Sequence, residues 1–272
     1  MSRQRSIRLL RGGADRRRGI YILPNLFTTA TVFLGVFAII RASSGDFLTA
    51  AVCIVIAHVS DGLDGRIARL THTESDFGVE YDSLADLVAF GVAPGILAYN
   101  WALGTWGHWG WLAASLYVTC GALRLARFNT QIAHVEKKSF VGLPIPAAAD
   151  MVAATVLLYF FFGGEGETSK HVLLLLMIYG LALLMVSNIR YYSFKDIDWR
   201  AQQPFYTLVG LVILVMFVVA QPQILLFCGM LVYVASGPVG WVMTVARRRR
   251  GRRERALRRT GSDDGVPGGD GA

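Results

Sequence analysis

The sequence predicts an all-α polytopic membrane protein with about eight transmembrane helices. Hydrophobic residues make up 54% of its 272 positions, 17% are charged, and the mean hydropathy is +0.45. Soluble domains carry about 25% charged residues, so this composition excludes an ordinary soluble domain. The positive charge is uneven, because seven arginines lie in residues 1–20 and nine in residues 247–259. An apolar chain between two basic ends is typical of a protein that crosses a membrane several times.

Eight apolar stretches are long enough, at about 1.5 Å per residue, to cross a hydrocarbon core of about 30 Å. Short segments that favour turns separate them, and no soluble domain fits between them. The predicted spans are 22–42, 47–70, 79–103, 108–128, 144–163, 171–189, 204–220 and 223–246.

The cationic residues orient this bundle. With both termini inside, 25 of the 27 Lys and Arg residues lie on the inner side, and only Arg41 and Lys170 lie outside. This distribution follows the positive-inside rule, whereas an odd number of spans would place one Arg-rich end outside. We interpret the basic ends as topology anchors that attract anionic headgroups. The tail lacks interleaved aromatic residues, so we expect no nucleic-acid partner.

Four aspartates, Asp61, Asp64, Asp82 and Asp86, interrupt the second and third spans. A carboxylate inside a membrane is costly unless it is paired, hydrated or bound to a metal. The first two are spaced i,i+3 and the last two i,i+4, so each pair lies on one helical face. The two spans form a helical hairpin, which brings the four carboxylates together. Their repulsion calls for cations, and hard oxygen ligands favour Mg²⁺, Mn²⁺ or Ca²⁺ over zinc.

Two glycines and an arginine lie in the same segment. Gly65 follows Asp64 directly, and Gly78 lies four residues before Asp82. Glycine in a span permits close approach of a neighbouring helix or of a ligand, and beside a group of acids we favour the ligand. Arg69, at the inner membrane face, is placed either to pair with an acid or to hold a phosphate.

Eight positions at fixed spacing, Asp61-x2-Asp64-Gly65-x2-Ala68-Arg69-x8-Gly78-x3-Asp82-x3-Asp86, resemble the signature of the CDP-alcohol phosphotransferase family. The resemblance implies a six-helix catalytic core at 21–200, after a basic cytoplasmic segment at 1–20. Two additional helices at 201–246 and an Arg-rich, then disordered, cytoplasmic tail at 247–272 would follow. The implied reaction transfers a phosphatidyl-type group from a CDP-linked lipid to an alcohol and releases CMP.

The family's metal and catalytic roles carry over by position. Asp61, Asp64 and Asp82 resemble ligands of two divalent cations, Mg²⁺ or Mn²⁺, and Asp86 resembles a shared ligand or the general base. Cations that bridge a pyrophosphate would offset its charge and stabilise the departing CMP. The resemblance also implies a homodimer in the bacterial inner membrane, with both termini and the active site in the cytoplasm.

A second group of residues would bind the nucleotide. By resemblance, Gly65, Ala68 and Gly78 would let the cytidine nucleotide lie close to the backbone, and Arg69 would help to hold it. Two residues at the start of the first span, Asn25 and Thr28, face the nucleotide or cap and pack that helix.

Three stretches resemble the serine-accepting branch of the family: PNLFT (24–28), GALRLARFNT (121–130) with FVGLPIPAAAD (140–150), and SNIRYYSFKD (187–196). This resemblance implies CDP-diacylglycerol and L-serine as substrates. Serine is a zwitterion, so its carboxylate needs a cation. The candidates for the serine carboxylate or the lipid phosphate are Arg124, Arg127, Arg190 and Lys195, each of which could instead be a topology anchor.

Other polar residues have simpler explanations. Pro144 and Pro146 are expected to set the start of the fifth span. Asp150 is an acid on that span, where it would pair with an arginine or contact substrate. His58, about one turn before Asp61, is expected to be a packed histidine rather than a metal ligand.

Other functions remain open at this point. A phosphorylated acceptor, such as glycerol 3-phosphate or an inositol phosphate, would call for a denser basic pocket. A cation transporter would use the aspartates as an ion pathway, but the acids gather at one membrane face. An inactive scaffold is disfavoured because all eight motif positions are retained.

Overall fold

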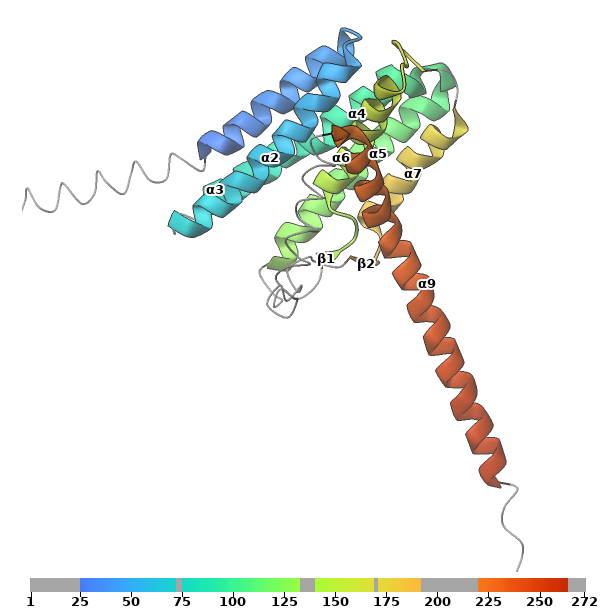
Figure 1. Cartoon of the computed structure of the whole chain (residues 1–272). Coiled ribbons are helices and arrows are strands. Elements are labelled where there is room, and N and C mark those ends of the chain that lie inside the picture. Colours follow the sequence, from blue (N-terminus) through green and yellow to red (C-terminus); the bar gives the residue numbers. More distant parts are fainter. Residues whose placement is uncertain (1–24, 72–74, 133–139, 169–170, 192–219, 264–272) are drawn as a thin grey trace, which may run out of the picture.

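The computed structural model describes residues 25–71, 75–132, 140–168, 171–191 and 220–263. These residues form a helical bundle (Figure 1), which confirms the predicted all-α class. The chain runs through a first helix, Asn25–Ser43, and then α2 (Phe47–Thr71), α3 (Asp76–Asp86), η1 (Leu87–Val92), α4 (Ala93–Ala98), η2 (Tyr99–Leu103), η3 (Gly104–Trp106), α5 (His108–Ile132), α6 (Ile145–Phe161), α7 (Val172–Val186) and α9 (Pro222–Asp263). The segments from α3 to η3 form one continuous third helix.

Seven of the eight predicted spans coincide with these helices, whereas 204–220 lies outside the described residues but for its last position. Among the described residues, four helices are long and apolar enough to cross a membrane: Asn25–Ser43, Phe47–Ile67, Asp76–Trp106 and Pro222–Thr244. The apolar helices α6 and α7 are shorter, with 17 and 15 residues. The protein is therefore a polytopic membrane protein.

Several helix ends differ by a few residues or more from their predicted positions, and two of these differences have a physical explanation. The third helix begins at Asp76 rather than at 79, because the Ser75 hydroxyl caps it by accepting a hydrogen bond from the Gly78 N–H at 3.1 Å. Helix α9 continues beyond 246 through the Arg-rich segment to Asp263. Arginine is a good helix former, so a basic composition does not end a helix that is already formed.

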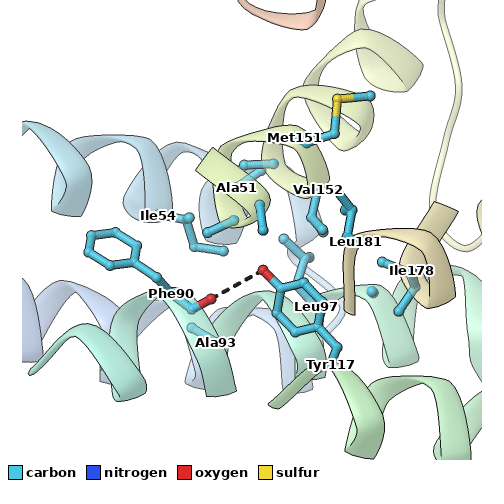
Figure 2. Close-up of a cluster of buried hydrophobic side chains, with 14 of the residues drawn as sticks. Ala51, Ile54, Phe90, Ala93, Leu97, Tyr117, Met151, Val152, Ile178 and Leu181 are labelled. Carbon is cyan, nitrogen blue, oxygen red and sulfur yellow. Dashed lines mark hydrogen bonds between the residues drawn. The ribbon is translucent and has the colours of Figure 1, made fainter. Parts of the chain in front are cut away.

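The third helix changes its winding directly after Asp86. The segment Leu87–Val92 is a π-helical turn, closed by hydrogen bonds between residues five apart. Pro94 follows and has no N–H to offer the Phe90 carbonyl four residues before it. The Tyr117 hydroxyl of α5 donates a hydrogen bond to that carbonyl at 3.2 Å, as Figure 2 shows. The third helix is thereby fastened to α5 inside the apolar core.

Small residues allow the helices to pack closely around this core. A Cβ added to Gly35 would lie 2.8 Å from Cα of Ala89, so the first and third helices touch through their backbones. Such contacts are typical of membrane helices, where van der Waals packing replaces a water-driven effect. Large apolar side chains point outward, with Phe33 69% and Leu173 80% exposed. An apolar outer surface is expected where lipid surrounds the bundle.

A short antiparallel strand pair ties two loops together. Strands β1 (Phe140–Val141) and β2 (Arg190–Tyr191) pair Phe140 with Tyr191. Gly142, which directly follows β1, has a φ of +84° and donates its N–H to the Ile189 carbonyl at 2.8 Å. Helix α6 then starts at Ile145, with Pro144 as its N-cap and Pro146 in the first turn, as predicted.

Candidate functional site

The structure brings the four predicted aspartates together. Carboxylate oxygens of Asp61 and Asp64, from α2, and of Asp82, from α3, all lie within 4.8 Å of one another. The Asp86 carboxyl group lies within hydrogen-bond reach of Asp61 and interacts electrostatically with Asp82. The i,i+3 and i,i+4 spacings therefore do present both pairs to one common space.

The chemistry of this cluster fits divalent cations. The Oδ1 atoms of Asp82 and Asp86 are buried and have no hydrogen-bond partner within the described part of the chain. A buried carboxylate oxygen without a donor is costly, so an external partner is expected. Carboxylate oxygens are hard ligands that suit Mg²⁺ and Mn²⁺.

The first helix orients one of these acids. Thr28 is 4% exposed, and its hydroxyl donates a hydrogen bond to Oδ2 of Asp64 at 3.0 Å. A hydrogen bond of this kind fixes the direction of a potential metal ligand. Sequence reasoning missed this contact, because it joins residues 36 positions apart. Asn25 lies nearby, with Oδ1 3.7 Å from where a Cβ on Gly78 would stand.

Gly65 faces open space rather than a neighbouring helix. A Cβ added there would meet only Nη2 of Arg69, at 4.0 Å. The Arg69 Nε donates to the Gly65 carbonyl at 2.7 Å, which holds this exposed arginine beside the open position. Ala68 occupies the same turn of α2. No neighbouring helix among the described residues contacts this position, so helix packing does not explain Gly65, and the approach of a ligand stays a prediction.

The structure describes the side chains of two of the four basic candidates, Arg124 and Arg127. Arg127 donates to the Asn188 side chain at 2.7 Å and to the Val186 carbonyl at 3.4 Å, so it anchors α5 to the end of α7. Arg124 is half-buried, and its guanidinium interacts electrostatically with Asp86. Arg190 lies in β2 with its side chain outside the description, and Lys195 lies outside the described residues. Of the two candidates whose side chains are described, Arg124 is the one with a buried Nε atom that has no hydrogen-bond partner among the described residues.

Asp150 pairs with a histidine rather than with an arginine. It is 2% exposed on α6, and its Oδ2 is hydrogen-bonded to Nδ1 of His58 on α2. The His58 ring packs edge-on against Phe90, with centroids 5.8 Å apart, and interacts electrostatically with Asp61. The His58 side chain is 39% exposed, so it is only partly packed, and the buried Asp150 carboxylate is a partner that the sequence did not predict.

A cavity of about 540 Å³ opens elsewhere, beside Ser43, Asn100 and Glu167. It contains none of the predicted site residues. The fully buried Phe90 and Leu97 lie on the third helix between the acids and this cavity. The cavity therefore shares no lining residue with the aspartate cluster.

Comparison with known proteins places the chain in one family. It matches the model of the CDP-alcohol phosphatidyltransferase family over residues 21–186, which include all four aspartates. It is 43% identical over 229 residues to a protein of Helicobacter pylori strain 26695 named CDP-diacylglycerol–serine O-phosphatidyltransferase, covering 84% of this chain and 94% of that protein. Proteins of the same name from Mycobacterium leprae and Bacillus subtilis are 36% identical over 232 residues and 38% identical over 173 residues. These matches cover 82% and 64% of this chain and 75% and 91% of the two proteins.

Proposed function

Because the chain belongs to the CDP-alcohol phosphatidyltransferase family, we propose that it transfers the phosphatidyl group of CDP-diacylglycerol to the hydroxyl of L-serine, giving phosphatidylserine and CMP. The observation that carries the chemistry is the convergence of Asp61, Asp64, Asp82 and Asp86 within the matched residues. The shared name of the relatives supports serine as the acceptor.

In this reaction the serine hydroxyl oxygen bonds to the phosphatidyl phosphorus, the bond from phosphorus to the CMP oxygen breaks, and the hydroxyl proton passes to a base. We assign Asp61, Asp64 and Asp82 as ligands of two divalent cations, Mg²⁺ or Mn²⁺, with Asp86 as a shared ligand or the general base. When bound, the cations offset the pyrophosphate charge and stabilise the departing CMP. An aspartate is a weak base for an alcohol, so Asp86 contributes mainly by holding the acceptor in place.

The substrates are held by the residues around this cluster. Gly65 lets the nucleotide approach the α2 backbone, with Ala68 in the same turn and Arg69 at its phosphate end. Gly78 and Asn25 lie across from each other beside the start of the third helix, and both line the proposed nucleotide site. Thr28 contributes by orienting Asp64.

The part of the site that would bind serine contains basic residues. Arg124 binds the serine carboxylate, since its Nε atom is buried without a hydrogen-bond partner among the described residues and a planar fork of donors matches a carboxylate. Arg190 and Lys195 remain candidates for the lipid phosphate. The proposal places the protein in the bacterial inner membrane as a homodimer, with both termini and the active site in the cytoplasm, where serine is supplied.

Acceptor-dependent CMP release tests the proposal. Purified protein in detergent receives CDP-diacylglycerol and Mn²⁺, with L-serine, glycerol 3-phosphate or inositol phosphate supplied in turn. We expect release with serine only, loss of release on chelation, and a fall in kcat of about 100-fold or more in Asp86→Asn. Asp76→Asn, an exposed acid on the same helix α3, is the matched control and should keep full activity. Release with another alcohol would keep the chemistry but refute the acceptor, and no release from folded protein would favour a transporter.

A further inference from the structure

The acidic half of the third helix has little apolar packing to hold it. In α3, which lies beside α2 (Figure 1), only Ala85 is buried. Large apolar side chains of α3 point outward, with Phe77 70% and Leu84 62% exposed. A helix with one buried residue has little apolar surface to fix its rotation about its own axis. Other contacts therefore have to set the direction in which Asp82 and Asp86 point.

Two hydrogen bonds to neighbouring helices supply such contacts, at the residues directly before and after Asp82. The Ser83 hydroxyl accepts a hydrogen bond from Nδ2 of Asn129, on α5, at 3.0 Å. The Tyr81 hydroxyl lies 3.0 Å from Oγ1 of Thr29, on the first helix. Successive residues of an α-helix point about 100° apart around its axis. These two flanking bonds, Ser83–Asn129 and Tyr81–Thr29, therefore hold α3 on the two sides of Asp82.

The flanking bonds share one arrangement of donors. The Ser83 hydroxyl donates to the carbonyl four residues earlier in its own helix at 3.0 Å, which leaves its oxygen free to accept from Asn129. The amide Oδ1 of Asn129 is farther from this hydroxyl, at 3.4 Å. The Thr29 hydroxyl likewise donates to the carbonyl four residues earlier at 2.7 Å. A hydroxyl has a single hydrogen, so Tyr81 is the donor to Thr29. Each flanking bond thus joins α3 to a hydroxyl or amide group with a defined direction.

Asn129 is carried by a helix that is itself anchored. Arg127, two residues earlier on α5, donates to the Asn188 side chain at 2.7 Å and to the Val186 carbonyl at 3.4 Å. These bonds attach the inner end of α5 to the end of α7. The bond from Asn129 to Ser83 then connects this anchored end to α3.

We propose that the two flanking bonds position Asp82 for a divalent cation. They fix the rotation of α3, so that carboxylate oxygens of Asp61, Asp64 and Asp82 stay within 4.8 Å of one another. Without these bonds a cation would have to order α3 as it binds, which lowers its affinity. The four residues of the flanking bonds are positioning residues, because they act through Asp82. This inference rests on the proposed function, in which the aspartates hold the cations.

Mn²⁺ binding to the purified protein in detergent, followed by electron paramagnetic resonance without substrate, tests this inference. Asn129→Ala removes a donor and leaves the Ser83 hydroxyl bonded to its own helix. We expect this variant to raise the Kd for Mn²⁺ about fivefold. Tyr81→Phe should raise it less, because its bond is exposed and water replaces part of it. Both changes together should raise the Kd about tenfold, and an unchanged Kd in this double variant would overturn the inference.

A matched control separates positioning from general stability. Tyr179→Phe removes a hydroxyl that bonds the Trp109 carbonyl at 3.1 Å, at the other end of α5, and should keep the wild-type Kd for Mn²⁺. Melting temperatures measured with a chelator verify that each variant is folded. Tyr81→Phe keeps the ring that stacks on Phe77, with centroids 5.9 Å apart, so it tests the inference even if Asn129→Ala does not fold.

A double-variant cycle shows whether Asn129 acts through Ser83. In the Asn129→Ala background, Ser83→Ala should add little to the Kd for Mn²⁺, whereas additive effects would refute the coupling. Asp82→Asn distinguishes the two levels of the argument. If it weakens Mn²⁺ binding and loss of both flanking bonds does not, this inference fails and the proposed function stands. If Asp82→Asn also leaves the Kd unchanged, the proposed metal site itself fails.

Discussion

Gly65→Ala should leave the fold intact and weaken the binding of CDP-diacylglycerol. The added Cβ would meet no atom closer than Nη2 of Arg69, at 4.0 Å, which is ordinary van der Waals contact. In a helix interior alanine is favoured over glycine by about 1 kcal/mol, so the melting temperature should stay equal or rise. A nucleotide that lies against the α2 backbone would lose this contact to the new methyl group. We expect a rise of about tenfold or more in the KM for the lipid, or about 1.4 kcal/mol.

Two other glycines provide the controls. Gly62→Ala lies one turn earlier on α2, where an added Cβ meets nothing within 4 Å. It should stabilise the helix as much as Gly65→Ala does, but it changes a position outside the eight-residue motif. Gly95→Ala would place its Cβ 2.9 Å from Cγ2 of Val118 and should lower the melting temperature. Michaelis constants and thermal unfolding in detergent are measured for all three. If Gly65→Ala keeps the wild-type KM, or loses stability as Gly95→Ala does, the glycine serves packing and our reasoning is wrong.

Three further substitutions probe the site and the core. Thr28→Val removes the donor to Asp64, and the Mn²⁺ concentration for half-maximal activity should rise about tenfold; an unchanged Mn²⁺ titration would contradict the orienting role. Asp82→Asn should raise the melting temperature in the presence of a chelator, because it relieves repulsion among the acids. It should also reduce the stabilisation by Mn²⁺, which for a ligand at 100 times its Kd is about 2.7 kcal/mol. A stabilisation by Mn²⁺ equal to that of the wild type would speak against Asp82 as a ligand. Tyr117→Phe leaves the Phe90 carbonyl without this donor and should cost about 1 kcal/mol in thermal unfolding with unchanged KM values; an unchanged melting temperature would refute that contribution.

Local sequence patterns predicted the features that depend on neighbouring residues. The i,i+3 spacing of Asp61 and Asp64 and the i,i+4 spacing of Asp82 and Asp86 are set by helical geometry, so the shared face of each pair followed directly. Pro144 could be placed at the start of α6 because proline fits there and not in a helix interior. Hydropathy located the spans, since the length of an apolar stretch is itself the signal.

Contacts between distant segments could not be predicted in this way. The bond from Thr28 to Asp64 joins residues 36 apart, and the His58–Asp150 pair joins residues 92 apart. Periodicity gives the face on which a side chain lies but not the rotation of the helix it meets. Arg124 and Arg127 are equivalent by composition and by their place at the end of α5, and only the neighbouring helices distinguish an anchor from a candidate ligand.

The π-helical turn at Leu87–Val92 shifts the register between the two halves of the third helix. A π-turn, whose hydrogen bonds join residues five apart, holds one residue more than an α-turn. Compared with an uninterrupted α-helix, this extra residue rotates the face of Asp86 relative to that of Leu97 by about 100°. The half that ends in the acids thereby faces the aspartates of α2, while the other half buries Leu97 in the apolar core. Deleting one residue from this turn would restore an ordinary α-helix and rotate Asp82 and Asp86 relative to the core. The extra residue in this membrane helix thus sets the angle between the acidic cluster and the apolar core.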